Sequence, residues 1–106
     1  MRVSVHEEML MIKHVVFMKL KPGVTDEQVD GLRKGLSALP GKIPEIKEYS
    51  FGRDVVRSDR SMDFALVSAF TDLEALKRYS EHPDHQAVVS LVRDLSEKTL
   101  TVDYVF

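Results

Sequence analysis

The chain has 106 residues, which is enough for one domain and too few for a two-domain enzyme with a separate cofactor module. Its 15 lysines and arginines face 17 acidic residues, and no basic run exceeds two residues, so nothing indicates a surface for nucleic acid or anionic membranes. The absence of cysteine excludes disulfides, thiolate metal sites and a cysteine nucleophile, while 43% hydrophobic residues predict a packed core.

The first residues are predicted to precede the folded domain. Glu7 and Glu8 interrupt any apolar stretch of the kind found in a signal peptide, and no apolar run is long enough to cross a membrane. We therefore expect a cytoplasmic protein. Regular patterning begins only at Ile12, so we predict an N-terminal extension over residues 1–11 and a single domain over residues 12–106.

Residues 12–20 are predicted to form a strand in which both the even and the odd positions carry apolar side chains. Lys21–Gly23 ends this strand, and Thr25 with Gln28 then shows the pattern of a capping box at a helix start. Apolar residues recur at helical spacing up to Pro40–Gly41, where the helix is expected to end.

Two further strands are predicted over residues 46–55 and 64–70, separated by a polar loop. Asp72 is expected to cap a short helix, and Pro83 suits the first turn of another helix directly after it. Residues 98–106 alternate as a final strand. This order of elements predicts an α+β, ferredoxin-like split βαβ fold, an antiparallel four-stranded sheet with helices on one face.

The strands are apolar on both faces, so one layer of helices would leave a large apolar surface exposed. We expect small odd-numbered residues of the third strand, such as Ala65, to lie under the helices. A second copy stacked sheet to sheet would then cover the even-numbered face and form a homodimeric α+β barrel. The residues expected on that face are Val16, Met18, Phe64 and Leu66, with Val102 or Tyr104.

Four segments resemble one known family. They are residues 13–24, 39–44, 79–86 and 103–104, of which the His-Pro-x-His box at 82–85 is the most specific. Together they resemble the stress-responsive α/β-barrel (Dabb) family over nearly all of residues 12–106. The resemblance implies a dimeric α+β barrel. Most family members have no established activity, but a plant polyketide cyclase of the family closes a ring by aldol chemistry without metal or cofactor.

Tyr79, His82 and His85 lie within seven residues of one another, and His14 lies on the first strand. A histidine near a helix N-terminus is disfavoured as imidazolium and can act as a general base, and a phenol can donate to a developing oxyanion. The resemblance implies that His85 and Tyr79 are the catalytic pair. It also implies pocket positions for His14, Val16, Leu66 and Ser68, and His82 is a further candidate for a pocket or ligand contact.

Structural roles compete with these assignments. His82 is expected to cap a helix through a backbone hydrogen bond, Tyr79 has the spacing of a residue at the core edge, and His14 has that of a satisfied core histidine. For His85 the structural and the catalytic interpretation stay open. The spacing of His82 and His85 allows a zinc ligand pair, but further ligands are lacking, so no metal is expected.

The sequence also departs from the cyclase pattern. Ser80, Glu81 and Gln86 stand where the cyclase has apolar residues, and Gly31 and Gly35 stand in a helix that carries aromatic side chains in the cyclase. Each glycine costs about 1 kcal/mol relative to alanine in a helix interior, which indicates either close packing or a locally weak helix. We therefore expect a pocket of different shape and do not assume the same product.

Three functions follow. The first is a homodimeric Dabb protein of undefined activity with a pocket for a small apolar or polyketide-like molecule. The second is a cofactor-free cyclase, isomerase or lyase in which His85 is the base and Tyr79 the hydrogen-bond donor. The third is a cofactor-independent or haem-handling monooxygenase, which depends on fold analogy alone. No cofactor, metal, nucleic acid or membrane partner is expected.

Overall fold

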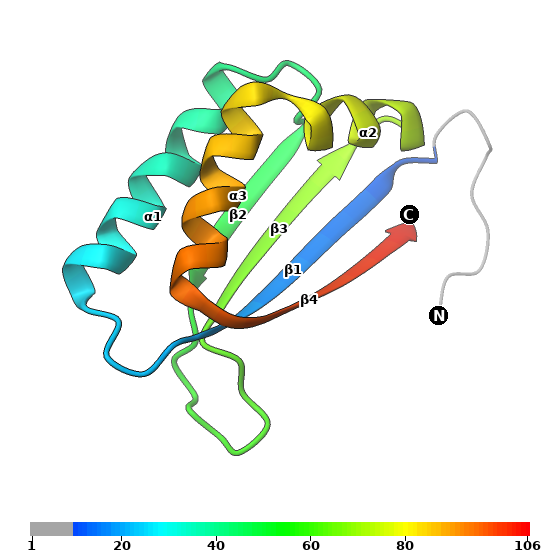
Figure 1. The fold of residues 1–106 in the computed structure, drawn as a ribbon. Coiled ribbons are helices and arrows are strands. Elements are labelled where there is room, and N and C mark those ends of the chain that lie inside the picture. The colour runs from blue at the N-terminus through cyan, green and yellow to red at the C-terminus, as the bar shows by residue number, and fades with distance from the viewer. Residues whose placement is uncertain (1–9) are drawn as a thin grey trace.

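The computed structural model describes residues 10–106, so most of the predicted extension over residues 1–11 lies outside the described residues. The four strands form one antiparallel sheet in the order β2-β3-β1-β4, which confirms the ferredoxin-like fold (Figure 1). The elements are β1 (Ile12–Leu20), α1 (Asp26–Ala38), a short 3₁₀ turn η2 (Leu39–Gly41), β2 (Glu48–Arg53), β3 (Phe64–Phe70), α2 (Leu73–Glu81), α3 (Pro83–Leu95) and β4 (Ser96–Val105).

The helices begin where the sequence predicts. Thr25 accepts a hydrogen bond from the backbone N–H of Gln28, and the Gln28 side chain accepts one from the backbone of Thr25, which completes the capping box of α1. Asp72 caps α2 in the same way through the backbone N–H of Ala75. Pro83 occupies the first turn of α3, where its missing N–H has no consequence.

Two strands differ from the prediction at both ends: β2 spans Glu48–Arg53 rather than residues 46–55, and β4 spans Ser96–Val105 rather than residues 98–106. β2 ends at Arg53 rather than residue 55, because Val55 and Val56 project from a loop and are largely exposed. β4 begins at Ser96, directly after the last residue of α3, and not at Lys98. A helix and a strand are therefore joined without a connecting loop.

The assignment of sheet faces was wrong for β1 and β3. Their even-numbered residues lie under the helices, and Met18, Phe64 and Phe70 are fully buried there. Bulky side chains are needed in this layer because they fill the space between the helices and the sheet. The smaller odd-numbered residues, including Ala65, lie on the opposite face.

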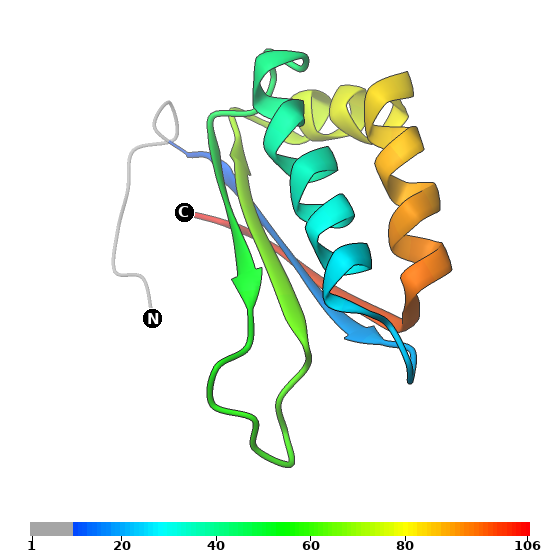
Figure 2. The ribbon, with the colours of Figure 1, turned by 90° about the vertical axis from the view of Figure 1, so that its left-hand side faces the viewer.

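That opposite face carries no helix within residues 10–106, as Figure 2 shows. The register pairs Val15 with Val102 and Phe17 with Leu100, so even-numbered residues of β4 share this open face with odd-numbered residues of β1. Leu100, Val102 and Tyr104 are 44%, 54% and 48% exposed. The prediction of a sheet with two apolar faces is confirmed, and so is the placement of Val102 and Tyr104.

The two glycines of α1 have different surroundings. A Cβ atom at Gly31 would meet nothing within 4 Å, whereas one at Gly35 would lie 3.5 Å from Val88 on α3 in ordinary contact. Neither glycine is required by close packing. Among residues 10–106, no helix is long and apolar enough to cross a membrane.

Candidate functional site

A cavity of about 180 Å³ lies between the helices and the sheet. His14, Tyr79 and His85 all line it, although they come from β1, α2 and α3. An apolar cavity of about 150 Å³ holds benzene, so this space suits a group of one-ring size. The remaining lining is Val16, Met18, Leu36, Leu66, Val88, Val89, Val92 and Thr99.

Tyr79 and His85 meet because α2 and α3 are separated by a single residue. His82 ends α2 and caps α3, and its extended backbone turns the chain between the two helices. Tyr79 in the last turn of α2 then faces His85 in the first turn of α3. Their ring centroids lie 4.1 Å apart with an angle of 43° between the planes.

The environment of His85 favours a neutral imidazole with a free Nε2 atom. Its Nδ1 atom lies 3.2 Å from the main-chain oxygen of Ser80, and because a carbonyl can only accept, Nδ1 carries the proton. Burial lowers the pKa of His85; the hydrogen bond to Ser80 opposes this, and the charges of His14 and His82 add to it. Neutral Nε2 can therefore accept a proton at neutral pH.

The pKa of Tyr79 is shifted in the opposite direction to that of His85. Its side chain is 1% exposed, and its hydroxyl lies 3.2 Å from the hydroxyl of Tyr49 on β2. Burial raises the pKa of Tyr79, and the charge and hydrogen bond of Tyr49 raise it further. Burial also raises the pKa of Tyr49. Tyr79 consequently keeps its proton and can serve as a hydrogen-bond donor.

Sequence reasoning missed the partner of His14. The Nδ1 atom of His14 is hydrogen-bonded to the carboxylate of Asp103, because the β1–β4 register places the two residues opposite each other. From the sequence, Asp103 was noted as part of a segment that resembles the family. A weak signal was present, since Asp103 shares its face of β4 with Thr99 and Thr101, a polar row unlike the apolar row on the other face.

Of the predicted pocket residues, Val16 and Leu66 line the cavity, whereas Ser68 and His82 do not. The Ser68 hydroxyl is buried and lies 3.3 Å from the main-chain oxygen of His14, to which it donates. The His82 Nδ1 atom accepts from the backbone N–H of Asp84, as expected of a helix cap. Ligand contacts for Ser68 and His82 stay predictions. Residues 10–106 contain no group of three His, Cys, Asp or Glu side chains that could hold a metal ion.

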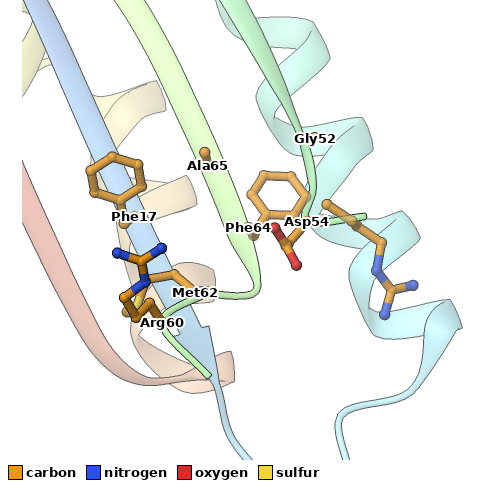
Figure 3. A pocket seen from close by; sticks show the side chains of 8 residues that line it. Phe17, Gly52, Asp54, Arg60, Met62, Phe64 and Ala65 are labelled. Carbon is orange, nitrogen blue, oxygen red and sulfur yellow. The ribbon is translucent and has the colours of Figure 1, made fainter. Parts of the chain in front are cut away.

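A second hollow of about 330 Å³ lies at the end of the sheet beside the loop between β2 and β3. Phe17 and Ala65 form part of its floor, and Arg60 and Met62 approach from the loop (Figure 3). This hollow contains no histidine or tyrosine. It therefore lacks a group that exchanges protons near neutral pH, and the cavity at His85 is the better candidate site.

The match with known proteins covers the whole described domain. The model of the stress-responsive A/B barrel domain, Dabb, matches residues 12–106. The chain belongs to the Dabb family. An uncharacterized protein of Streptomyces coelicolor is 37% identical to this Dabb chain over 98 residues, which cover 91% of this chain and 100% of that protein.

Two further relatives bear on function and assembly. Olivetolic acid cyclase of Cannabis sativa is 27% identical over 90% of this Dabb chain and 96% of its own. A crystal structure described as a dimeric ferredoxin-like protein of unknown function, from Thermobifida fusca, superposes with a TM-score of 0.85 at 27% identity and covers 100% of both chains. The family thus includes a cyclase as well as members without a known reaction.

Proposed function

We propose that this Dabb protein is a cofactor-free enzyme that removes a proton from a carbon next to a carbonyl group, with His85 as general base and Tyr79 as hydrogen-bond donor. The observation that carries this proposal is the contact between Tyr79 and His85 in one cavity. Their environments favour a neutral base and a protonated phenol at the same pH, which is the pairing that acid–base catalysis requires.

In the proposed reaction, Nε2 of His85 takes the proton and the electron pair of the broken C–H bond moves into an enolate. The enolate oxygen accepts a hydrogen bond from the Tyr79 hydroxyl, which keeps its own proton. The enolate carbon then adds to a second carbonyl carbon, and the resulting alkoxide takes the proton from the His85 imidazolium. If the proton instead returns to a different carbon, the reaction is an isomerisation. Neither route needs an oxidant.

The size and lining of the cavity define the substrate class. Seven aliphatic or thioether side chains surround the two histidines and the tyrosine, so the reacting end of the substrate is apolar apart from its carbonyl. A volume of about 180 Å³ accommodates a single ring or a short chain. Olivetolic acid cyclase, a relative at 27% identity, supports carbonyl chemistry in this family.

Deuterium exchange tests this proposal without knowledge of the natural substrate. Phenylacetone, a ketone with one aromatic ring, is incubated with the protein in D₂O, and loss of its α-proton signals is followed by NMR. We expect catalysed exchange that falls by about 10²–10⁴-fold in His85→Ala. Ser90→Ala, an exposed change on the same helix, should exchange as the unsubstituted protein does. An unchanged rate in folded His85→Ala would show that His85 is not the base.

We also infer that a second copy of this chain covers the open face of the sheet. The support is the exposed apolar row of Leu100, Val102 and Tyr104, and the dimeric state named for the related protein of Thermobifida fusca. The two sheets would stack face to face. In such a homodimer, the helix-side cavities of the two protomers would lie on the outer sides of the paired sheets.

A further inference from the structure

Another hollow adjoins the cavity at His85. This outer hollow has a volume of about 270 Å³ and is lined by Val89, Val92, Arg93, Ser96, Glu97, Lys98 and Thr99. Val89, Val92 and Thr99 line both spaces. The two spaces therefore adjoin each other between α3 and the beginning of β4.

The connection between α3 and β4 explains this opening. The helix ends at Leu95 and the strand begins at Ser96, so the two elements diverge from one point, as Figure 1 shows. Pairing of Met18 with Thr99 places Thr99 on the helix side of the sheet. Thr99 is nevertheless exposed, which shows that the helices leave this part of β4 uncovered.

Two side chains that line the outer hollow have hydrogen-bond donors without a partner among residues 10–106. The Oγ atom of Ser96 is buried and has no hydrogen-bond partner among residues 10–106, an unusual condition for a hydroxyl. Arg93 lies exposed in the last turn of α3 and forms no ion pair with any described residue. Both donors suit an oxygen atom of a ligand.

The two other charged residues of the hollow are less suited to this role. Lys98 pairs with Lys19, so its side chain lies on the open face of the sheet, away from the helices. Glu97 is the extra residue of a β-bulge between Ser96 and Lys98, and its carboxylate would repel an anion. A neutral carbonyl oxygen therefore fits the hollow better than a carboxylate.

We propose that the ligand enters between α3 and β4, and that an oxygen at its far end accepts hydrogen bonds from Ser96 and Arg93. This inference rests on the proposed function, because the near end is the carbonyl group at His85 and Tyr79. The ligand class is an elongated dicarbonyl compound with an apolar middle segment, which passes Val89 and Val92.

Two ketones of equal chain length test the far contact. Undecane-2,10-dione has a second carbonyl that undecan-2-one lacks, its chain length matches the rise of about 16 Å between residues 85 and 96, and NMR titration gives the dissociation constant of each. We expect the dione to bind about three- to tenfold more tightly, the range typical of one or two hydrogen bonds. The ratio should fall towards one in Ser96→Ala and persist in Ser90→Ala. A ratio of one in the unsubstituted protein, or an unchanged ratio in Ser96→Ala, overturns the proposal.

The entry path is tested separately. Because the chain has no cysteine, Arg93→Cys has a single thiol that a benzyl methanethiosulfonate can label. We expect the label to slow exchange of undecane-2,10-dione between its free and bound states, measured from NMR line shapes. Labelled Lys77→Cys on α2 is the control, and an equal exchange rate in both overturns the path. Neither measurement needs turnover, and both can be repeated in His85→Ala, so failure of the proposed chemistry is distinguishable from failure of this inference.

Discussion

His14 and Asp103 lie opposite each other on neighbouring strands, and the Asp103 carboxylate accepts a hydrogen bond from Nδ1 of His14. This contact fixes the orientation of the imidazole ring. The other ring nitrogen, Nε2, then lies beside the cavity. We therefore expect Asp103 to be a positioning residue, since it orients His14, which lines the cavity beside His85 and Tyr79.

Asp103→Asn is expected to reduce exchange of phenylacetone by about tenfold, less than the 10²–10⁴-fold effect expected on removal of the base. The amide can no longer accept as a carboxylate does, so the Nδ1 proton of His14 should lose its strongly deshielded NMR signal. Thr101→Ala, a change on the same face of β4, should keep that signal. A retained signal in Asp103→Asn would contradict the positioning role.

Tyr79→Phe is expected to lower the exchange rate by about 10²–10³-fold, because it removes the donor to the enolate oxygen. Tyr49→Phe serves as the comparison: it removes the hydroxyl 3.2 Å from that of Tyr79 and leaves the proposed donor in place. Tyr49→Phe should lower the exchange rate less than Tyr79→Phe does. Equal rates for Tyr79→Phe and the unsubstituted protein, with both folded by circular dichroism, would exclude Tyr79 as the donor.

The lowered pKa of His85 predicts a loss of stability in mild acid. Burial holds the folded pKa below the ordinary value of 6.5, so between these two values the unfolded chain binds more protons than the folded chain. The stabilising contribution is complete above about pH 6.5 and is lost as the pH falls towards the folded pKa. Urea unfolding gives the free energy of unfolding at pH 7.5 and at pH 5.5. The difference between these two values should be smaller in His85→Gln than in the unsubstituted protein. An identical difference would mean that His85 does not carry this pH dependence.

Val102→Lys should prevent the proposed homodimer, because it places a charge in the middle of the open apolar face. Sedimentation at micromolar concentration is expected to show a dimer for the unsubstituted protein and a species of about 12 kDa for the variant. Thr101→Lys is the matched control, since Thr101 directly precedes Val102 in β4 and points to the helix side. A monomeric unsubstituted protein would refute the assembly.

Gly31→Ala is expected to stabilise the protein by about 1 kcal/mol, since the position is helical and an added Cβ meets no atom within 4 Å. Gly23→Ala should instead destabilise it, because Gly23 has a φ of +85°, a conformation that L-residues rarely adopt. Urea unfolding measures the free energy of unfolding of both variants relative to the unsubstituted protein. A destabilised Gly31→Ala would indicate that this glycine serves packing that the structure does not show.

Local patterns were sufficient for most of the fold. The capping box at Thr25, the cap at Asp72 and the break at Pro83 set the helix starts, because each depends on residues within one turn. The sheet faces were harder to predict. Val15 and Val16 are equally apolar, so the first strand alone gives no indication of which side meets the helices.

In the candidate site, too, contacts between residues close in sequence were easier to predict than contacts between distant segments. Tyr79 and His85 are close in sequence, and the break between α2 and α3 brings them together, so the motif could indicate their contact. Asp103 lies 89 residues from His14, and its role depends on the pairing register of β1 with β4. Register between strands far apart in the sequence depends on how their faces pack, so the local pattern of one segment does not indicate it.

Strand β4 serves two surfaces at once. Thr99 and Asp103 point to the helix side, where the cavity and its histidine lie, while Leu100 and Val102 project from the other side of the same strand. As an edge strand, β4 has a neighbouring strand, β1, on one side only, so a partner that covers the open face of β4 also steadies its helix side. Catalytic rate per protomer should accordingly decline when the protein is diluted below its self-association constant.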